Sequence, residues 1–395
     1  MSINLINTLA QPLRMSAKFV NQNEQASGLS TSRFVQDTAS CFVPKAVFAR
    51  SKADLSENAL LEFSESFLVY YVPALLGEKF ARKIFSKNLN KSEKNLVSKT
   101  AVELLKEGTS ANKKVMPVKA AIALTATVIP LIEFALNYVK NIFTLKVFKK
   151  SNFNDIAALE NNKEDKKQQE KVKNSAKKNI LRAGTVFAGA LALAGLIFKR
   201  GENSKSLQNI SEAILAPGTK FFKNNVKKQN FFNKYFSLDF NSQNGKLVLS
   251  KGQLTSCVLV GGAGYFGASY DRGKQNFLET LSRFPLVGFY IITGSDLFEK
   301  GFKKLLHKSG KCKEMIDKNL NTPDFSKIET MAKDLAEKNK TTIETEYKKL
   351  VKQKVLISGV PYLFSIGFMG FFVAGMTNLF TKLRFNNDKK NVKKM

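Results

Sequence analysis

The chain has 395 residues, and 63 Lys and Arg against 32 Asp and Glu give it a formal net charge of +31 at pH 7. A charge that large indicates an anionic partner, either phospholipid headgroups or nucleic acid. Cys41, Cys257 and Cys312 are odd in number and far apart, and His307 is the only histidine. This pattern excludes a disulfide framework and a zinc site built on several Cys or His, so we expect no metal and no cofactor.

The N-terminal part of the chain is polar. We expect residues 1–57 to be poorly ordered, as polar chain ends usually are. Residues 1–25 carry no acidic side chain before Glu24, which also fits an organellar targeting peptide, and both interpretations stay open. Residues 58–119 then predict amphipathic helices with one short apolar segment.

Four stretches with little or no charge predict membrane-spanning helices. A helix needs about 20 mostly apolar residues to cross a bilayer. The four stretches near or above that length are 120–139, 183–198, 252–270 and 355–381. Glu133 is the single charge among them. The last stretch is the clearest, since a soluble helix of that length would show a polar face.

Shorter runs and polar connections lie around these stretches. Residues 66–77 and 284–295 are apolar but too short to cross a bilayer, so they suit re-entrant or interfacial segments. Residues 160–179 hold almost nothing to bury and predict a solvated helix or a disordered linker. Asn244 and Gly245 lie between short apolar-rich runs and predict a small β-hairpin.

Basic connections indicate where the chain meets its anionic partner. Residues 219–236 alternate aromatic residues with lysines, which favours an interfacial helix on anionic lipid. A basic surface helix packed on its own protein fits the same pattern, and so does a stacking platform for nucleic-acid bases. Residues 297–354 predict a basic amphipathic helical region, and residues 382–395 a basic tail.

One glycine-rich motif points to an enzyme. Gly262, Gly264 and Gly267 spell G-x-G-x-x-G, and Gly261, Gly264 and Gly267 follow at three-residue spacing. Residues 258–267 resemble the first strand and turn of short-chain dehydrogenases and epimerase-like proteins. This resemblance implies an NAD(P)-binding oxidoreductase in which those glycines approach the pyrophosphate. The residues that follow, however, do not predict the further alternating strands and helices of such a domain.

The same segment, taken as a helix, presents a face of small residues. Four of them fall on one side at 100° per residue: Cys257, Gly261, Gly264 and Ala268. A similar face occurs in the stretch 183–198, made of Gly184, Ala188 and Ala192. Small residues let membrane helices approach closely. We therefore expect these two faces to pack against each other.

Glu133 is followed one helical turn later by Asn137. Acidic residues inside a membrane often mark proton or ion paths, so this pair predicts a polar transport site. The alternative is that Glu133 lies near the end of its helix and reaches the membrane interface.

Together these patterns predict an all-α, multi-pass transmembrane protein of about four spans with two short apolar segments. The expected segments are 1–57, 58–119, a membrane region with basic loops at 120–296, 297–354, a last span at 355–381, and 382–395. We expect an integral protein of the cell (inner) membrane or of an organellar membrane.

The preferred function is a non-enzymatic structural or interaction role at an anionic membrane surface. Its expected partners are anionic phospholipid and other membrane proteins or a second copy, with nucleic acid a less favoured partner and no small-molecule substrate identifiable. A transporter or channel subunit that uses Glu133 and Asn137 is the alternative. The NAD(P)-binding oxidoreductase is the second alternative.

Overall fold

A computed structural model of the chain describes Thr38 and residues 41–73, 81–160, 165–243, 246–248, 250–323 and 327–392. The first half of the described chain contains the helices α4 (Lys52–Pro73), α5 (Arg82–Phe85), α6 (Lys91–Leu96), α7 (Ala101–Glu107), α8 (Asn112–Ala126), α9 (Val128–Phe148), α10 (Phe153–Ile156) and α11 (Lys166–Arg200). The second half contains the α-helices α12 (Lys205–Leu215), α13 (Pro217–Phe221), α14 (Val226–Tyr235), α15 (Lys251–Tyr270), α16 (Lys274–Phe289), α17 (Ser295–Lys308), α18 (Ile328–Asn339), α19 (Ile343–Ser365) and α20 (Val373–Val392). Two π-helical turns, η2 (Tyr290–Gly294) and η4 (Ile366–Phe372), join α16 to α17 and α19 to α20.

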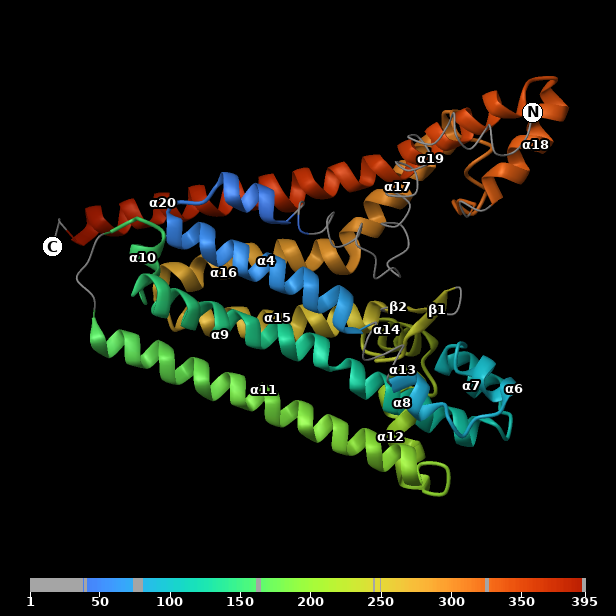
Figure 1. The fold of residues 1–395 in the computed structure, drawn as a ribbon, viewed down its shortest axis with the longest axis horizontal. Coiled ribbons are helices and arrows are strands. Elements are labelled where there is room, and N and C mark those ends of the chain that lie inside the picture. Colours follow the sequence, from blue (N-terminus) through green and yellow to red (C-terminus); the bar gives the residue numbers. More distant parts are fainter. Residues whose placement is uncertain are drawn as a thin grey trace.

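The fold is an elongated helical bundle (Figure 1). Helix α9 packs against α4, α11 and α15, and α16 packs against α15 and α20. The small helices α6, α7, α12, α13 and α14 gather at one end of the bundle, whereas α10 and the end of α20 lie at the other. The described part of the chain is therefore nearly all helical, as the sequence predicts.

Three described helices are long and apolar enough to cross a membrane: Asn112–Phe148, Lys166–Arg200 and Ile343–Asn391. They contain the predicted spans 120–139, 183–198 and 355–381. The fourth predicted span, 252–270, forms helix α15 but is not among the three. Its glycines and hydroxyl side chains lower its apolarity, and it packs between α9 and α16.

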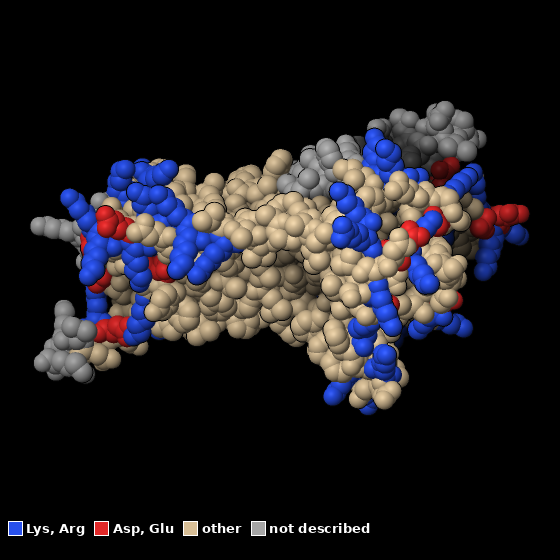
Figure 2. All heavy atoms as spheres, turned by 90° about the horizontal axis from the view of Figure 1, so that it is seen from below, with Lys and Arg blue, Asp and Glu red and all other residues tan. Residues whose placement is uncertain are grey.

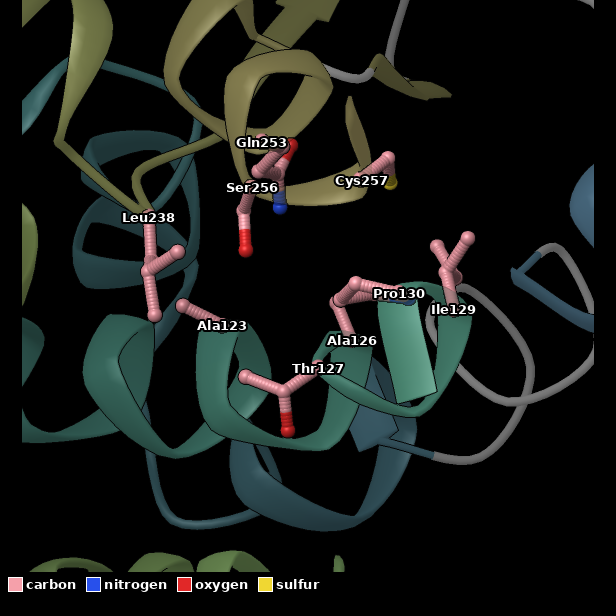
Figure 3. A pocket seen from close by; sticks show the side chains of 9 residues that line it. All are labelled: Ala123, Ala126, Thr127, Ile129, Pro130, Leu238, Gln253, Ser256 and Cys257. Atoms are coloured by element: carbon pink, nitrogen blue, oxygen red, sulfur yellow. The ribbon is translucent and has the colours of Figure 1, made fainter. Parts of the chain in front are cut away.

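The first of these helices bends where α8 meets α9. Pro130 has no N–H to donate to the carbonyl of Ala126, so the regular helical bonding is interrupted there. Helix α8 ends at Ala126, and the hydroxyl of Thr127 donates to the carbonyl of Leu124 at 2.6 Å. The break places the start of α9 beside the start of α15 (Figure 3).

Helix α11 joins a polar half to an apolar half. Asp165 caps its N-terminus by accepting a hydrogen bond from the backbone N–H of Lys167 at 2.9 Å. The expected linker 160–179 is helical from Lys166 onward, and residues 161–164 lie outside the described part of the chain. The predicted span 183–198 forms the second half of the same helix.

The two short apolar runs are parts of longer helices. Residues 284–295 cover the end of α16, the turn η2 and the start of α17, so the path from Lys274 to Lys308 is helical throughout. The run 66–77 is the end of α4 as far as Pro73, and residues 74–80 are outside the described part. Residues 284–295 therefore do not form a separate re-entrant segment.

Helices α17, α18 and α19 form a unit with its own core, which projects from the bundle in Figure 1. Its buried core consists of Leu306, Cys312, Met315, Ile316, Ile328, Ala332, Tyr347, Leu350, Val351 and Ile357. Burial in this core raises the pKa of the Cys312 thiol above its ordinary value. Helix α19 then continues through η4 into α20 and the bundle, so the expected boundary at residue 354 falls inside a helix.

A short antiparallel pair stands where the hairpin is predicted. Strands β1 (Asn241–Gln243) and β2 (Lys246–Val248) pair with Gln243 opposite Lys246. The predicted turn residues 244 and 245 lie outside the described part of the chain. In the expected N-terminal segment 1–57, described residues 41–47 are helical, and α4 begins at Lys52.

Candidate functional site

Residues 258–267 lie inside the continuous helix α15. Ser250 caps that helix and Gln253 completes a capping box, so the segment begins as an ordinary helix. A dinucleotide motif needs a strand, a tight turn and a helix N-terminus at this point. The segment is therefore helical, as the preferred interpretation expects. The alternative of a strand and turn is excluded, and Gly261, Gly264 and Gly267 form no phosphate-binding loop.

The glycines of α15 are instead needed for close contact with α9. A Cβ atom on Gly264 would lie 2.6 Å from the carbonyl oxygen of Phe134, and one on Gly261 would lie 2.8 Å from a carboxylate oxygen of Glu133. Cys257 and Ala268, on the same face, are buried beside Ile129 and Tyr138 respectively. The small face thus packs against a helix, but its partner is α9.

The predicted partner face on α11 points away from the bundle. Gly184, Ala188 and Ala192 are exposed, and a Cβ atom on Gly184 would meet nothing within 4 Å. The buried residues of α11 lie on another side of the helix: Val172, Ala176, Ala183, Ala194 and Ile197. The predicted contact between the two small faces is therefore wrong, because α9 occupies the position beside α15.

Glu133 and Asn137 lie at the packed interface of α9. The side-chain amide of Asn137 donates to the backbone carbonyl of Glu133 at 2.9 Å, and Asn137 is buried. The carboxylate of Glu133 lies beside Gly261. Neither residue lines the two cavities described below.

A small pocket opens at the break between α8 and α9 (Figure 3). Its lining consists of Ala123, Ala126, Thr127, Ile129, Pro130, Leu238, Gln253, Ser256 and Cys257. In Figure 3 the α15 side chains approach from one side and those of α8 and α9 from the other. Among the described residues no charged side chain lines it, so we assign it to the irregular packing that Pro130 causes.

The candidate functional site is a cluster of buried charges at the opposite end of α9. Arg272 follows α15, and its guanidinium donates to both carboxylate oxygens of Glu57 in α4, at 2.9 and 2.5 Å. The side chains are only 1% and 7% exposed. The hydroxyl of Thr144 in α9 also donates to Glu57. Three elements that are distant in the sequence thus meet at one ion pair.

A second arginine joins two more carboxylates in the same cluster. The guanidinium of Arg50 donates to both oxygens of Glu279 in α16, at 2.8 and 3.2 Å. Its Nε and its backbone N–H donate to Asp54 at 3.1 and 3.0 Å. The hydroxyl of Thr381 in α20 donates to Glu279 at 2.7 Å. These bonds join the start of α4 to α16 and α20.

A small cavity, of which a water-sized group can enter about 50 Å³, lies within this cluster. Its charged lining residues are Lys45, Arg50, Asp54, Glu57, Lys140, Arg272, Glu279 and Arg283. Polar and aromatic side chains complete the charged wall, among them Asn276, Tyr265 and Phe153. Lys45 forms an ion pair with Glu62, which is buried on α4.

Sequence reasoning did not identify this cluster. Its ion pairs join residues 215 and 229 positions apart, which no local pattern connects. One usable signal is present in α4, where Asp54, Glu57 and Glu62 recur near helical spacing opposite Phe63 and Phe67. In a soluble protein such an acidic face would be expected to face solvent, but here it is buried inside the bundle.

A second buried charge network holds the other end of the bundle. Lys119 of α8 is fully buried, and its ammonium lies 2.9 Å from a carboxylate oxygen of Asp239. The same ammonium donates to the carbonyls of Val97 and Lys99 at 3.0 and 2.8 Å. The ring of Phe240 lies 4.2 Å away. Through these contacts, Lys119 connects α8 to the segment that follows α6 and to the segment that precedes β1.

Within the described residues, no three His, Cys, Asp or Glu side chains are placed to share a metal ion. Comparison of the chain with protein-family models, with curated proteins and with solved structures found no match. The function must therefore be inferred from the fold and the buried charges themselves.

Proposed function

We propose that the chain is a multi-pass membrane protein with a structural or interaction role, held in its membrane by basic ends that bind anionic phospholipid. The membrane is the cell (inner) membrane or that of an organelle. Its partners in the membrane are other membrane proteins or a second copy of the chain. The observation that carries the proposal is the polarity of the bundle: ion pairs are buried inside it, and the middle of the face in Figure 2 is uncharged.

Helix α4 supports this most clearly. Asp54, Glu57 and Glu62 on its inner face are buried, whereas Phe63 and Phe67 on its outer face are 45% and 52% exposed. In water, this arrangement would expose apolar surface and desolvate charges at the same time. In a bilayer, the apolar rings meet lipid and the carboxylates find partners inside the bundle.

The second half of helix α11 presents an exposed apolar surface whose length is close to the thickness of the hydrocarbon core. Residues 183–198 carry no charge, and Val186 and Leu196 are 58% and 51% exposed. Those residues rise about 24 Å along the helix, close to the hydrocarbon thickness of about 30 Å when flanking Arg and Lys reach outward. In Figure 2 an uncharged band separates two groups of Lys and Arg.

Helices α13 and α14 support contact with anionic lipid at one edge of this band. Phe222 and Phe232 stack with ring centroids 4.4 Å apart, and Phe221 and Phe231 are 66% and 51% exposed. Lysines surround these rings, and the ammonium of Lys228 lies 5.8 Å from the Phe222 ring. Rings that enter the hydrocarbon edge beside lysines that meet phosphate are typical of an interfacial helix.

A single introduced tryptophan tests this contact, because the chain contains no Trp. In vesicles with anionic lipid, we expect Trp emission from a Phe221→Trp variant to shift to shorter wavelength and to be quenched by brominated acyl chains. Leu305→Trp is the matched control, since Leu305 is 62% exposed on α17 in the projecting unit. Equal quenching at the two positions, or none at position 221, would contradict the proposal.

A transporter or channel subunit remains the second candidate function. Glu133 and Asn137 gain no support as its path, because they pack at a helix contact and line neither cavity described above. The observation that favours transport is the charged cavity between α4, α9, α16 and α20. Buried charges in membrane bundles commonly mark such paths.

A further inference from the structure

The charged cavity between α4, α9, α16 and α20 holds more cationic than anionic side chains. Its five cations are Lys45, Arg50, Lys140, Arg272 and Arg283. Its three carboxylates are Asp54, Glu57 and Glu279. Lys140 and Arg283 are half-buried, whereas Arg272 is buried. The pairing inside the cavity shows which of the cations have no carboxylate in direct contact.

All three carboxylates are already engaged by two arginines. Arg272 binds Glu57 through two hydrogen bonds. Arg50 binds both Glu279 and Asp54. Because Lys45 pairs with Glu62, the cations left over are Lys140 and Arg283.

Lys140 and Arg283 form no ion pair with any residue that the structure describes. The ammonium of Lys140 lies 5.2 Å from the centroid of the Tyr265 ring, which offers only a weak cation–π contact. Glu57 and Glu65 interact electrostatically with Lys140 but form no ion pair with it. The buried Nε of Arg272 also has no hydrogen-bond partner.

We propose that this cavity binds a phosphate-type oxyanion through Lys140, Arg283 and the Nε of Arg272. Guanidinium groups and ammonium groups are the usual donors to phosphate oxygens, and the bonds are strong because both partners are charged. The space inside the cavity that a water-sized group can enter is about 50 Å³. One water needs about 10–15 Å³ by the same measure, so the space suits a single small anion. The anion would contact Lys140 and Arg283 directly, which no carboxylate of the described residues does.

The phosphate can arrive free or as a phospholipid headgroup. Lys140 lies two turns before the end of α9 at Phe148, which is about 12 Å along the helix axis. A headgroup at that end of the bundle is within reach of the cavity. The experiment therefore needs one arm for each source.

The first arm uses the purified full chain in a neutral detergent. Sodium phosphate is titrated at constant ionic strength, and thermal unfolding and calorimetric Kd are measured. We expect Tm to rise and saturate, and Lys140→Met and Arg283→Met each to weaken the Kd about tenfold or more. Lys140→Arg should retain binding, and Arg182→Met, at an exposed position on α11, should leave it unchanged.

The second arm uses nanodiscs of phosphatidylcholine with or without phosphatidic acid. If a headgroup is the ligand, phosphatidic acid raises the Tm of the wild-type chain, native mass spectrometry detects one bound lipid, and both Met variants lose both effects. Free phosphate then acts only after lipid removal. No Tm rise with either probe, or an equal rise in wild type and both Met variants, would overturn the proposal. Because the first arm is read in detergent, it does not depend on membrane insertion.

Discussion

At the scale of single residues, the ion pair between Arg272 and Glu57 joins α4 to the segment that follows α15. Both side chains are buried, and the guanidinium donates to both carboxylate oxygens. A buried charge that loses its partner is strongly destabilising, whereas replacing both members by apolar residues of similar size is often tolerated. The pair is therefore best probed by single and double substitution together.

Glu57→Ala should lower the free energy of unfolding by about 3–5 kcal/mol, because Arg272 is left buried without its counter-charge. The double variant Glu57→Leu with Arg272→Met should recover most of that loss. Glu107→Ala is the control, since the Lys99–Glu107 pair is 44% and 40% exposed and its loss should matter by less than about 1 kcal/mol. Denaturant titration in detergent measures all three, and equal effects of Glu57→Ala and Glu107→Ala would refute the assignment.

The buried pairs also show where sequence reasoning reaches its limit. Lys45, Arg50 and Arg272 lie outside the uncharged stretches, so a search for charges inside those stretches finds only Glu133. Their partners are set by how the helices pack, and no local spacing encodes that packing. The acidic residues of α4 do recur near helical spacing, but the spacing does not say whether that face meets water or arginine.

At the scale of elements, the glycine motif of α15 fits two structures, a nucleotide-binding turn and a helix with a small face. Its small face is predictable from helical spacing alone, and the structure places that face in a close helix contact. The partner helix is not predictable in the same way, because α9 and α11 are both apolar helices next to each other. The exposed small residues of α11 show that small size permits a close contact without specifying one.

Two glycine substitutions compare the packed face of α15 with an exposed position on α11. Gly264→Ala should lower the free energy of unfolding by about 1–3 kcal/mol, because the new Cβ would lie 2.6 Å from the backbone carbonyl oxygen of Phe134. Gly189→Ala on α11 meets nothing within 4 Å and should be neutral or stabilising by up to about 1 kcal/mol. Thermal unfolding of the two variants checks this, and the assignment fails if Gly189→Ala is the more damaging change.

At the scale of the whole molecule, charge distribution explains more than any single motif. Three of the uncharged stretches coincide with the three described helices that are long and apolar enough to cross a membrane. Length and composition alone decide whether a helix can cross a membrane, so the sequence is enough to predict them. The arrangement of those helices around a charged interior depends on contacts between residues hundreds of positions apart. In consequence the helical class and the small face of α15 were predictable, whereas the buried charge cluster and the partner helix of α15 were not.

We propose that the bundle lies within a bilayer, with its apolar surface toward lipid and its buried ion pairs inside. Alkaline carbonate extraction of membranes from cells that express the chain tests this most directly, because it releases proteins held only by surface charge. We expect the chain to stay in the membrane pellet and to enter solution only when detergent is added. Release of the chain into the carbonate supernatant would contradict it.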